Sequence, residues 1–246
     1  MANRIAGGTA THQSQRLVTP PARTFRNTGP SGAPLTVYPP DVVEETYRKI
    51  PFEWTRSLPP PDDSLPPDWA WLDGCSSPEL IRLVGDVLTS SPGPEDRHAV
   101  EKLGPDGAAR RILALAQGFS YLPDRWQVLA IRGKAAGFVL PVVYDNCSRD
   151  GLDEATIYHL GVAPEQRGHG IGRLLLRRAT RLLVSHGVWR IYCDTPSNDH
   201  PMIHLLESEG WTRLPPQERP IPALYRRPAV QRSGDIPEHW AQSTSA

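Results

Sequence analysis

The sequence has few cysteines and no long apolar run. Its 246 residues include three cysteines, Cys75, Cys147 and Cys193, and an odd number at such wide spacing indicates neither a disulfide framework nor a metal site. No segment approaches the ~20 apolar residues of a membrane helix. Residues 1–15 lack the apolar core of a signal peptide. We therefore expect a cytoplasmic protein with no membrane partner and no metal ion.

An excess of charge of either sign is also missing. Lys plus Arg and Asp plus Glu number 27 each, so the net charge gives no argument for a nucleic-acid partner. Positive charge gathers only locally, at Arg167, Arg173, Arg177, Arg178, Arg181 and Arg190. We interpret most of these as a solvated helix face. The two that lie nearest a glycine-rich segment, Arg167 and Arg173, are candidates for binding a phosphorylated ligand.

Proline is plentiful, and its distribution suggests the domain boundaries. The 27 prolines crowd residues 20–67 and return after Pro215, whereas periodic apolar segments fill the middle of the chain. We therefore predict a disordered N-terminal extension over residues 1–65, one folded domain over residues 66–230 and a disordered tail over residues 231–246. Within the extension, Asp41 to Ile50 is expected to form a short helix that Pro51 ends.

The periodic segments predict an α/β fold with a mixed sheet. Expected strands cover 69–72, 126–131, 136–143, 155–162 and 188–193, with a last one near Tyr225; expected helices cover 78–89, 108–119, 171–186 and 201–208. Residues 126–143 form an antiparallel hairpin, and 155–193 form a βαβ unit whose two strands should be parallel. The consistent assembly is a mostly antiparallel sheet with helices on both faces.

A glycine-rich loop lies between the strand and the helix of the βαβ unit. Arg167, Gly170 and Gly172 have the spacing R-x-x-G-x-G, and the helical pattern starts at once after them. Backbone N–H groups at such a helix start bind anions, and glycine allows a phosphate to approach closely. The alternative is a tight turn that serves packing alone. A Rossmann motif is disfavoured, because seven residues separate Val162 from Gly170.

These segments resemble the GNAT superfamily of acyl-CoA N-acyltransferases over residues 154–211. The matching positions are Val162, Pro164, Arg167, Gly170, Gly172, Leu174, Leu175, Asn198, Ile203, Gly210 and Trp211. The resemblance implies a GNAT-type sheet and the transfer of an acetyl group from acetyl-CoA to a primary amine of a small molecule or protein. A longer acyl donor and a homodimer stay open. The segment 152–156 is also similar to bacterial enzymes that acetylate protein N-termini, but it is too short to identify the substrate.

The resemblance also implies which residues hold the cofactor. The strand before the loop would pair with the pantetheine arm, and the loop and helix start would bind the pyrophosphate. The implied residues are Leu160, Gly161, Val162, Arg167, Gly168, His169, Gly170, Ile171, Gly172, Arg173 and Asn198. For Asn198, capping of the following helix is an equally good interpretation.

The attacking amine must lose a proton, and a nearby general base would assist. The candidates are Glu154, His159 and Asp194, with Asp153 beside them; Glu154 is preferred because relatives often use a carboxylate on this strand. Tyr158 and His159 should alternate, so that only one faces the cleft.

Two positions depart from the pattern of relatives. Leu206 stands where many relatives have a proton-donating Tyr, and Cys193 stands where the enzymes that act on protein N-termini have a Glu. An acyl-CoA-binding module without turnover is therefore the alternative function. Trp126, Tyr144 and Trp211 are further candidates for a pocket wall, although large aromatic side chains are more often part of the core.

Overall fold

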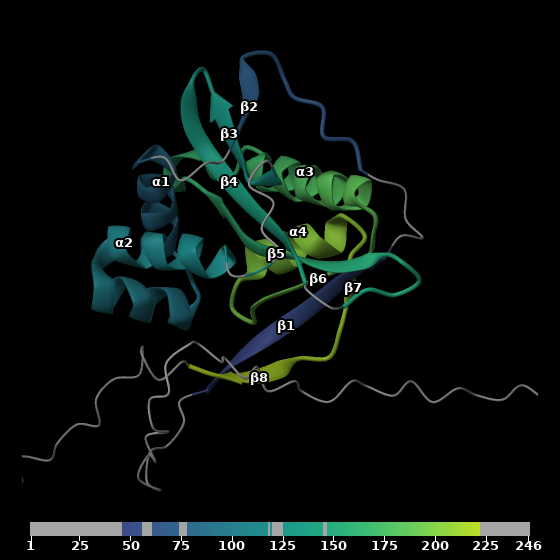
Figure 1. Ribbon diagram of the computed structural model, residues 1–246. Coiled ribbons are helices and arrows are strands. Elements are labelled where there is room, and N and C mark those ends of the chain that lie inside the picture. Colours follow the sequence, from purple (N-terminus) through teal and green to yellow (C-terminus); the bar gives the residue numbers. More distant parts are fainter. Residues whose placement is uncertain are drawn as a thin grey trace, which may run out of the picture. The chain divides into compact units, whose positions relative to one another are not determined.

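The computed structural model describes residues 46–55, 61–73, 78–117, 119, 125–144 and 147–221. These residues form a mixed eight-stranded sheet and four α-helices (Figure 1). The strands are β1 (Thr46–Thr55), β2 (Trp69–Asp73), β3 (Gln127–Ile131), β4 (Lys134–Val143), β5 (Asp153–Val162), β6 (Val188–Pro196), β7 (Thr212–Arg213) and β8 (Gln217–Pro220). The helices are α1 (Pro78–Thr89), α2 (Pro94–Ala116), α3 (Ile171–His186) and α4 (His200–Ser208).

The sheet has the order β2-β3-β4-β5-β6-β1-β7, and β8 also pairs with β1. Every paired neighbour is antiparallel except β5 and β6, which are parallel as the βαβ unit predicts. The predicted fold class, a mixed and mostly antiparallel sheet, is therefore confirmed. The prediction for α3 is correct at both ends, and Gly187 ends that helix in the left-handed conformation that glycine adopts without strain.

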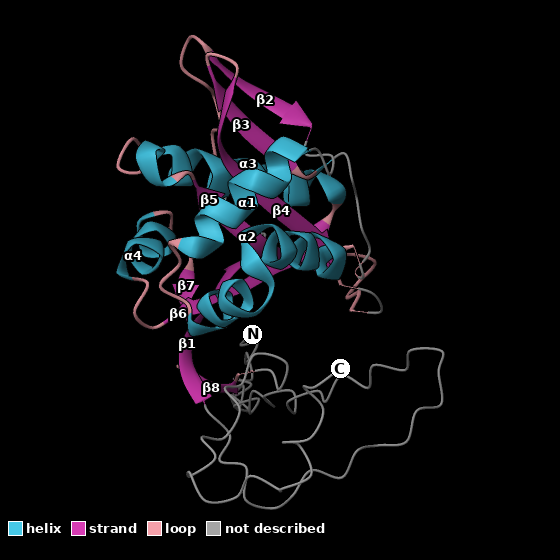
Figure 2. Ribbon diagram, turned by 90° about the vertical axis from the view of Figure 1, so that its left-hand side faces the viewer, coloured by secondary structure: helices cyan, strands magenta, loops and turns pink. Residues whose placement is uncertain are grey.

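Helices cover both faces of the sheet and divide the core in two. One cluster joins α1 and α2 to Phe138, Leu140 and Val142 of β4. The other joins α3 and α4 to the opposite face, where Leu175 and Leu206 pack among the strands. Figure 2, turned so that α1 and α2 face the viewer, shows the sheet behind these helices. The alternation of side chains along β4 produces this division, because successive residues point to opposite faces.

The parallel pair β5–β6 separates soon after it starts. The register joins Asp153 to Val188 and Ala155 to Ile191, and no pairing between the two strands follows although both continue. Unpaired backbone in the middle of a sheet must find other partners or face a cavity. The two strands therefore leave an opening at their carboxyl ends, on the side of the sheet covered by α1 and α2.

The prediction of a helix over Asp41 to Ile50 and of an unstructured extension up to residue 65 is wrong for the residues described. Thr46–Thr55 form β1, which pairs with β6 on one side and with β7 and β8 on the other. Phe52 is fully buried, and Ile50 and Trp54 are 3% exposed. This strand is held by pairing with residues about 140 positions away, which a local pattern does not contain. Residues 1–45, the region of Tyr225 and residues 231–246 lie outside the described residues.

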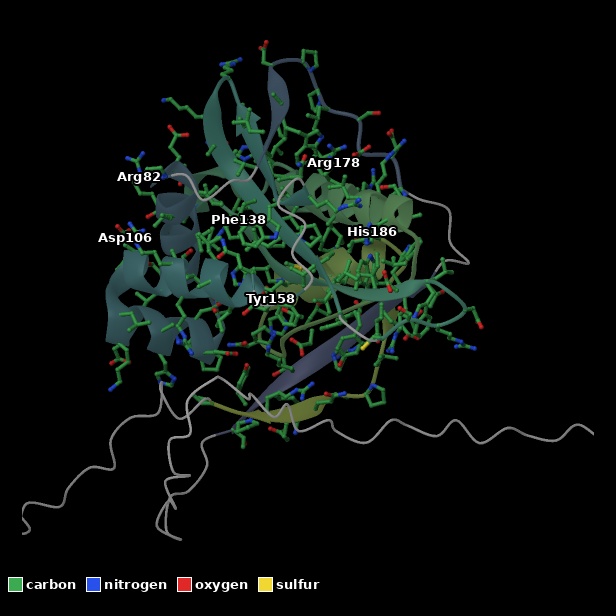
Figure 3. All side chains as sticks on the ribbon, in the orientation of Figure 1. Arg82, Asp106, Phe138, Tyr158, Arg178 and His186 are labelled. Carbon is green, nitrogen blue, oxygen red and sulfur yellow. The ribbon has the colours of Figure 1, made fainter. Side chains whose placement is uncertain are left out.

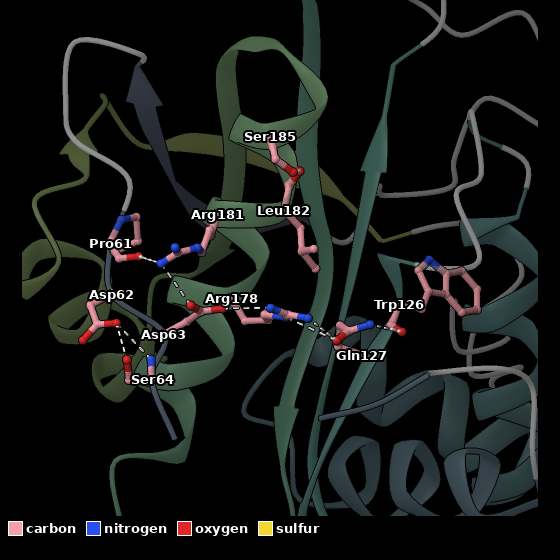
Figure 4. Close-up of polar contacts among 10 residues, drawn as sticks. All are labelled: Pro61, Asp62, Asp63, Ser64, Trp126, Gln127, Arg178, Arg181, Leu182 and Ser185. Carbon is pink, nitrogen blue, oxygen red and sulfur yellow. Dashed lines mark hydrogen bonds and ion pairs between the residues drawn. The ribbon is translucent and has the colours of Figure 1, made fainter. Parts of the chain in front are cut away.

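Several arginines of α3 are held in ion pairs, and the predicted solvated face is confirmed only in part, at Arg173 and Arg181, whose side chains are about half exposed. Figure 4 shows Arg178 between the carboxylate of Asp63, at 3.0 Å, and the side chain of Gln127, at 3.1 Å and 3.2 Å. Arg181 binds the same carboxylate at 3.2 Å. The segment around Asp63, also predicted to be loose, is thereby fixed against α3. Arg173 and Arg177 bind Glu209 in the same way, at 2.8 Å and 2.6 Å.

Candidate active site

A cavity of about 950 Å³ fills the opening between β5 and β6. Its walls come from β1, the α1–α2 connection, β5, the glycine-rich loop, β6 and the start of α4. Segments from both ends of the described chain therefore meet at one site. A volume of this size is in the range of cavities that enclose cofactors and small ligands.

The glycine-rich loop forms one end of the cavity. Gly168 and Gly170 have φ angles of +82° and +78°, a conformation that only glycine adopts without strain, and Gly170 is the residue that caps α3. The N–H groups of Gly168–Gly172 donate no hydrogen bond within the described residues. They lie at the positive end of the helix dipole. This end of the cavity can therefore bind an anion such as a pyrophosphate.

A bulge in β5 brings two neighbouring side chains into the cavity. Leu140 of β4 lies opposite His159 and Pro141 lies opposite Ile157, so the register between the two strands shifts by one residue at Tyr158. The prediction that only one of Tyr158 and His159 faces the cleft is wrong, because such an extra residue breaks the alternation of side chains. The ring of His159 stacks on that of Phe138, with an angle of 5° between the two ring planes. Phe138 and Tyr158 are labelled in Figure 3.

A charged cluster forms the other end of the cavity. Lys49 of β1 lies 2.8 Å from Asp194 of β6 and 3.9 Å from Glu95 of α2. The hydroxyl of Tyr47 donates a hydrogen bond to Glu95 at 2.5 Å. The pKa of Lys49 is raised above its ordinary value: burial lowers it, but the contacts with Asp194, Tyr47 and Glu95 together outweigh that effect. The ammonium of Lys49 is therefore a permanent positive charge in the cavity.

Tyrosines line the same region, and burial keeps them protonated. Burial, the largest effect, raises the pKa of Tyr144 to about 12 and that of Tyr47 well above its ordinary value. The pKa of Tyr192 is raised mainly by burial and also by the charge of Asp194. Burial likewise raises the pKa of the Cys193 thiol. These groups are proton donors at neutral pH.

Most of the candidate residues do meet in this cavity. Those that line it are His159, Leu160, Gly161, Val162, Arg167, Gly168, Gly170, Ile171, Gly172, Asp194 and Asn198. Arg167 donates a hydrogen bond to the hydroxyl of Ser90 at 2.5 Å, and Asn198 donates one to the carbonyl of Pro92 at 3.1 Å. The cap of α4 is Asp199, which accepts a hydrogen bond from the N–H of Met202, so helix capping does not require Asn198.

Four candidates lie outside the cavity lining, among them Asp153, which accepts a hydrogen bond from the hydroxyl of Ser148 at 2.5 Å. Glu154, the preferred base, binds the guanidinium of Arg190 at 3.1 Å, and Arg190 also binds Glu53 at 2.9 Å. Arg173 binds Glu209, and the ring Nδ1 of His169 lies 3.2 Å from the carbonyl of Gln166. Of the aromatic candidates, Tyr144 lines the cavity, whereas Trp126 is fully buried and Trp211 is 5% exposed. Arg190 thus binds the carboxylate that the resemblance to relatives favours as the general base.

Sequence reasoning missed the residues that β1 and the start of α2 contribute. Tyr47 and Lys49 lie in a segment predicted to be an extension, and Glu95 and Asp96 lie between the expected helices 78–89 and 108–119. A signal was present for α2, because Pro94 followed by two acidic residues is a typical helix start. The described residues contain no group of three or more His, Cys, Asp or Glu side chains that could hold a metal ion. None of the described helices is long and apolar enough to cross a membrane.

Comparison with known proteins finds similarity to acetyltransferases. Residues 96–211 match the model of the acetyltransferase (GNAT) family. The [ribosomal protein bS18]-alanine N-acetyltransferase of Escherichia coli (strain K12) is 30% identical over 103 residues, which are 42% of this chain and 63% of that enzyme's length. The L-2,4-diaminobutyric acid acetyltransferase of Nocardia farcinica (strain IFM 10152) is 23% identical over 153 residues, 60% of this chain and 72% of that protein.

Among solved structures, a GCN5-related N-acetyltransferase from Sphaerobacter thermophilus is similar with a TM-score of 0.46 and 20% identity. That likeness covers 72% of this chain and 53% of the other.

Proposed function

We propose that the chain carries an acetyltransferase domain of the GNAT family and transfers an acetyl group from acetyl-CoA to a primary amine. The observation that supports this most directly is the single cavity that runs from the glycine-rich loop to the side chains of His159 and Asp194. One end offers backbone N–H groups to a pyrophosphate, and the other offers groups that can accept and donate protons. Acyl transfer from a coenzyme A thioester to an amine needs both.

The donor would lie along β5 and the start of α3. Gly168, Gly170 and Gly172 would receive the pyrophosphate, and Arg167 at the rim would add a positive charge. The backbone of Leu160 and Val162 faces the opening left by β6, so the pantetheine arm can take the place of the missing strand. A backbone N–H of this strand would also polarise the thioester carbonyl. His169 and Arg173 are left out of this proposal because neither lines the cavity.

The amine would approach from the opposite wall. Asp194 stands on β6, across the opening from β5, and lines the cavity. We assign it as the base that takes the proton of the amine. His159 is the second candidate, but it belongs to the strand that would bind the donor, and its ring lies flat against Phe138. Glu154 is no longer proposed, because it does not line the cavity.

The leaving thiolate also has hydrogen-bond donors within the cavity. Leu206, at the position of the usual Tyr, is 1% exposed and has no ionisable group. Tyr47, Tyr144 and Tyr192 line the same cavity and stay protonated at neutral pH. The absence of a Tyr at position 206 is therefore compatible with turnover.

The proposal is tested by thiol release from acetyl-CoA in the presence of a panel of acceptors. The two relatives act on a protein alanine and on a diamino acid according to their names, so the panel includes an Ala-initiated peptide, L-2,4-diaminobutyrate and simple alkylamines. We expect amine-dependent thiol release, and a loss of about 100-fold or more in the Asp194→Asn variant. Silence with every acceptor would contradict the proposal. The cytoplasmic location expected from the sequence stays a prediction.

A second candidate function is an acyl-CoA sensor without turnover. The buried apolar side chain of Leu206 and the buried thiol of Cys193 favour it, because neither supplies the acid or base found in relatives. Calorimetry separates the two functions: a sensor binds acetyl-CoA and releases no thiol with any amine.

A further inference from the structure

β1 contributes side chains to the cavity that lie outside the family match. That match covers residues 96–211, whereas β1 covers Thr46–Thr55. Two residues of this strand, Tyr47 and Lys49, line the cavity. The likeness to the family therefore assigns no role to either of them, and their role must be derived from their contacts.

The pairing of β1 with β6 fixes Lys49 beside Asp194. Pro51 lies opposite Asp194, and Lys49 lies opposite Pro196, two positions along on the same face. Diagonal neighbours on an antiparallel pair are within reach of long side chains. The Nζ of Lys49 is 2.8 Å from Oδ1 of Asp194, and each side chain is only 21% exposed. A pair that is mostly shielded from water is held more firmly than a surface pair.

The other groups around Asp194 leave its second oxygen accessible. Arg219 of β8 is the closest further cation, at 3.9 Å from Oδ2, and its side chain is 43% exposed. Glu95 of α2 lies on the far side of Lys49, at 3.9 Å, and accepts the hydrogen bond of Tyr47. Tyr192 and Cys193 of β6 itself are uncharged near neutral pH, because their pKa values are raised. Lys49 is therefore the cation in closest contact with this carboxylate.

We propose that Lys49 is a positioning residue for proton transfer from the acceptor amine. Its ammonium binds Oδ1 of Asp194 and leaves Oδ2 to take the proton. This inference rests on the proposed function, and it adds a residue that the family match does not contain.

The proton and electron balance is simple. The ammonium form of the acceptor gives one proton to Oδ2 of Asp194, and the freed lone pair attacks the thioester carbonyl carbon. The C–S bond then breaks, and a second proton of the nitrogen passes to the sulfur. The products are an amide and the free thiol of coenzyme A.

The test is the pH profile of kcat/KM for Lys49→Met, Lys49→Arg and the wild type, with one amine. Without the ammonium, protonation of Asp194 becomes easier, so the acidic limb of the profile should move to higher pH by about one unit or more. Lys49→Arg keeps the cation and should restore the wild-type limb. The titration of the amine itself is common to all variants and cancels in the comparison.

Arg48→Met is the matched control. Arg48 is the preceding residue of β1, is 61% exposed and pairs with Glu218 at 2.9 Å, outside the cavity lining. Its removal also takes one positive charge from β1, and we expect no shift of the limb. If Lys49→Met does not fold, Lys49→Gln replaces it, because Gln keeps a hydrogen-bond donor without the charge and should shift the limb in the same direction.

An unshifted acidic limb in Lys49→Met, with wild-type thermal stability, would overturn the inference. So would a uniform loss of rate at every pH, which is the result of a merely structural role. Both outcomes leave the proposed function standing, since amine-dependent thiol release by the wild type is measured in the same experiment. Failure of that release would instead contradict the proposed function itself.

Discussion

Gly161 is required by packing. A Cβ atom built at this position would lie 2.5 Å from Cγ1 of Val87 and 2.8 Å from Cε1 of Phe138, closer than side chains tolerate. The reason is that helix α1 packs directly on β5 at this point. The same strand is proposed to bind the donor, so the close contact also fixes the wall of the cavity.

We predict that Gly161→Val lowers the free energy of unfolding by about 1–3 kcal/mol, the usual cost of overpacking a core. Urea denaturation followed by circular dichroism measures this change. Gly172→Ala is the stability control, because its Cβ would meet nothing closer than Cδ2 of Leu205, at an ordinary 3.4 Å. Equal stability of the wild type and Gly161→Val would show that α1 does not lie against β5 as described.

The burial of Tyr144 makes the free energy of unfolding depend on pH in the alkaline range. Burial raises its pKa from 10.0 to about 12, so between these values the folded state keeps a proton that the unfolded state loses. Its stabilising contribution is full below pH 10 and is lost as the pH rises through 12. A shift of about two units corresponds to roughly 2–3 kcal/mol. Urea titrations from pH 9 to 12 should show this loss, with a shallower slope in Tyr144→Phe; identical slopes would contradict the burial of Tyr144.

At the scale of elements, β1 decides how the cavity is completed. Its sequence, TYRKIPFEWT, contains a proline, which normally argues against a strand with neighbours on both sides. Pro51 is nevertheless accommodated opposite Asp194, and its carbonyl accepts a hydrogen bond from the N–H of Leu214 at 2.9 Å. The local sequence therefore predicts a helix that ends at Pro51. The observed strand is instead stabilised by pairing with residues far away in the chain.

Hydrogen exchange tests this element directly. The backbone amides of Ile50, Phe52 and Trp54 should exchange as slowly as those of β6, because the two strands pair along residues 49–55 and 190–196. Peptide-resolved mass spectrometry of the full-length chain measures the rates. If amides of this segment exchange within seconds while those of β6 stay protected, residues 46–55 do not form the strand. They would then belong to the extension that the sequence predicted.

Helix α2 shows the limit of periodicity as a guide. The apolar pattern predicts a helix only from residue 108, but α2 begins at Pro94, with a kink at Gly104, whose φ is +71°. The first half carries polar residues and a Gly-Pro pair, so no apolar stripe marks it. Its start nevertheless places Glu95 and Asp96 in the cavity. The apolar pattern does not reveal this helix start, and only Pro94 with the two acidic residues after it indicates it.

At the scale of the whole molecule, the predictions from the sequence agree best with the structure where elements that follow each other in the sequence also pack against each other. The strand, loop and helix from Asp153 to His186 follow each other directly, and the candidate residues of this unit were placed on the correct elements. The part of the cavity that is proposed to receive the amine is formed by β1, α2 and β6, which lie far apart in the sequence. No motif joins them, so Lys49 and Tyr47 could not be predicted. Glu154 and Arg173 form ion pairs with Arg190 and Glu209, which are distant in the sequence. The sequence alone could therefore not show that both residues lie outside the cavity lining.

The central claim is that the glycine-rich end of the cavity binds the pyrophosphate of acetyl-CoA, and calorimetric titration tests it most directly. We predict binding of one acetyl-CoA by the wild type and a loss of affinity of about 100-fold or more in Gly170→Glu, because a carboxylate would then stand at the anion site. Gly151→Glu is the matched control: Gly151 has almost the same φ, +77° against +78°, with equally open surroundings, and lies outside the cavity lining. Equal affinity of the wild type and Gly170→Glu, or no binding by the wild type, would contradict the account.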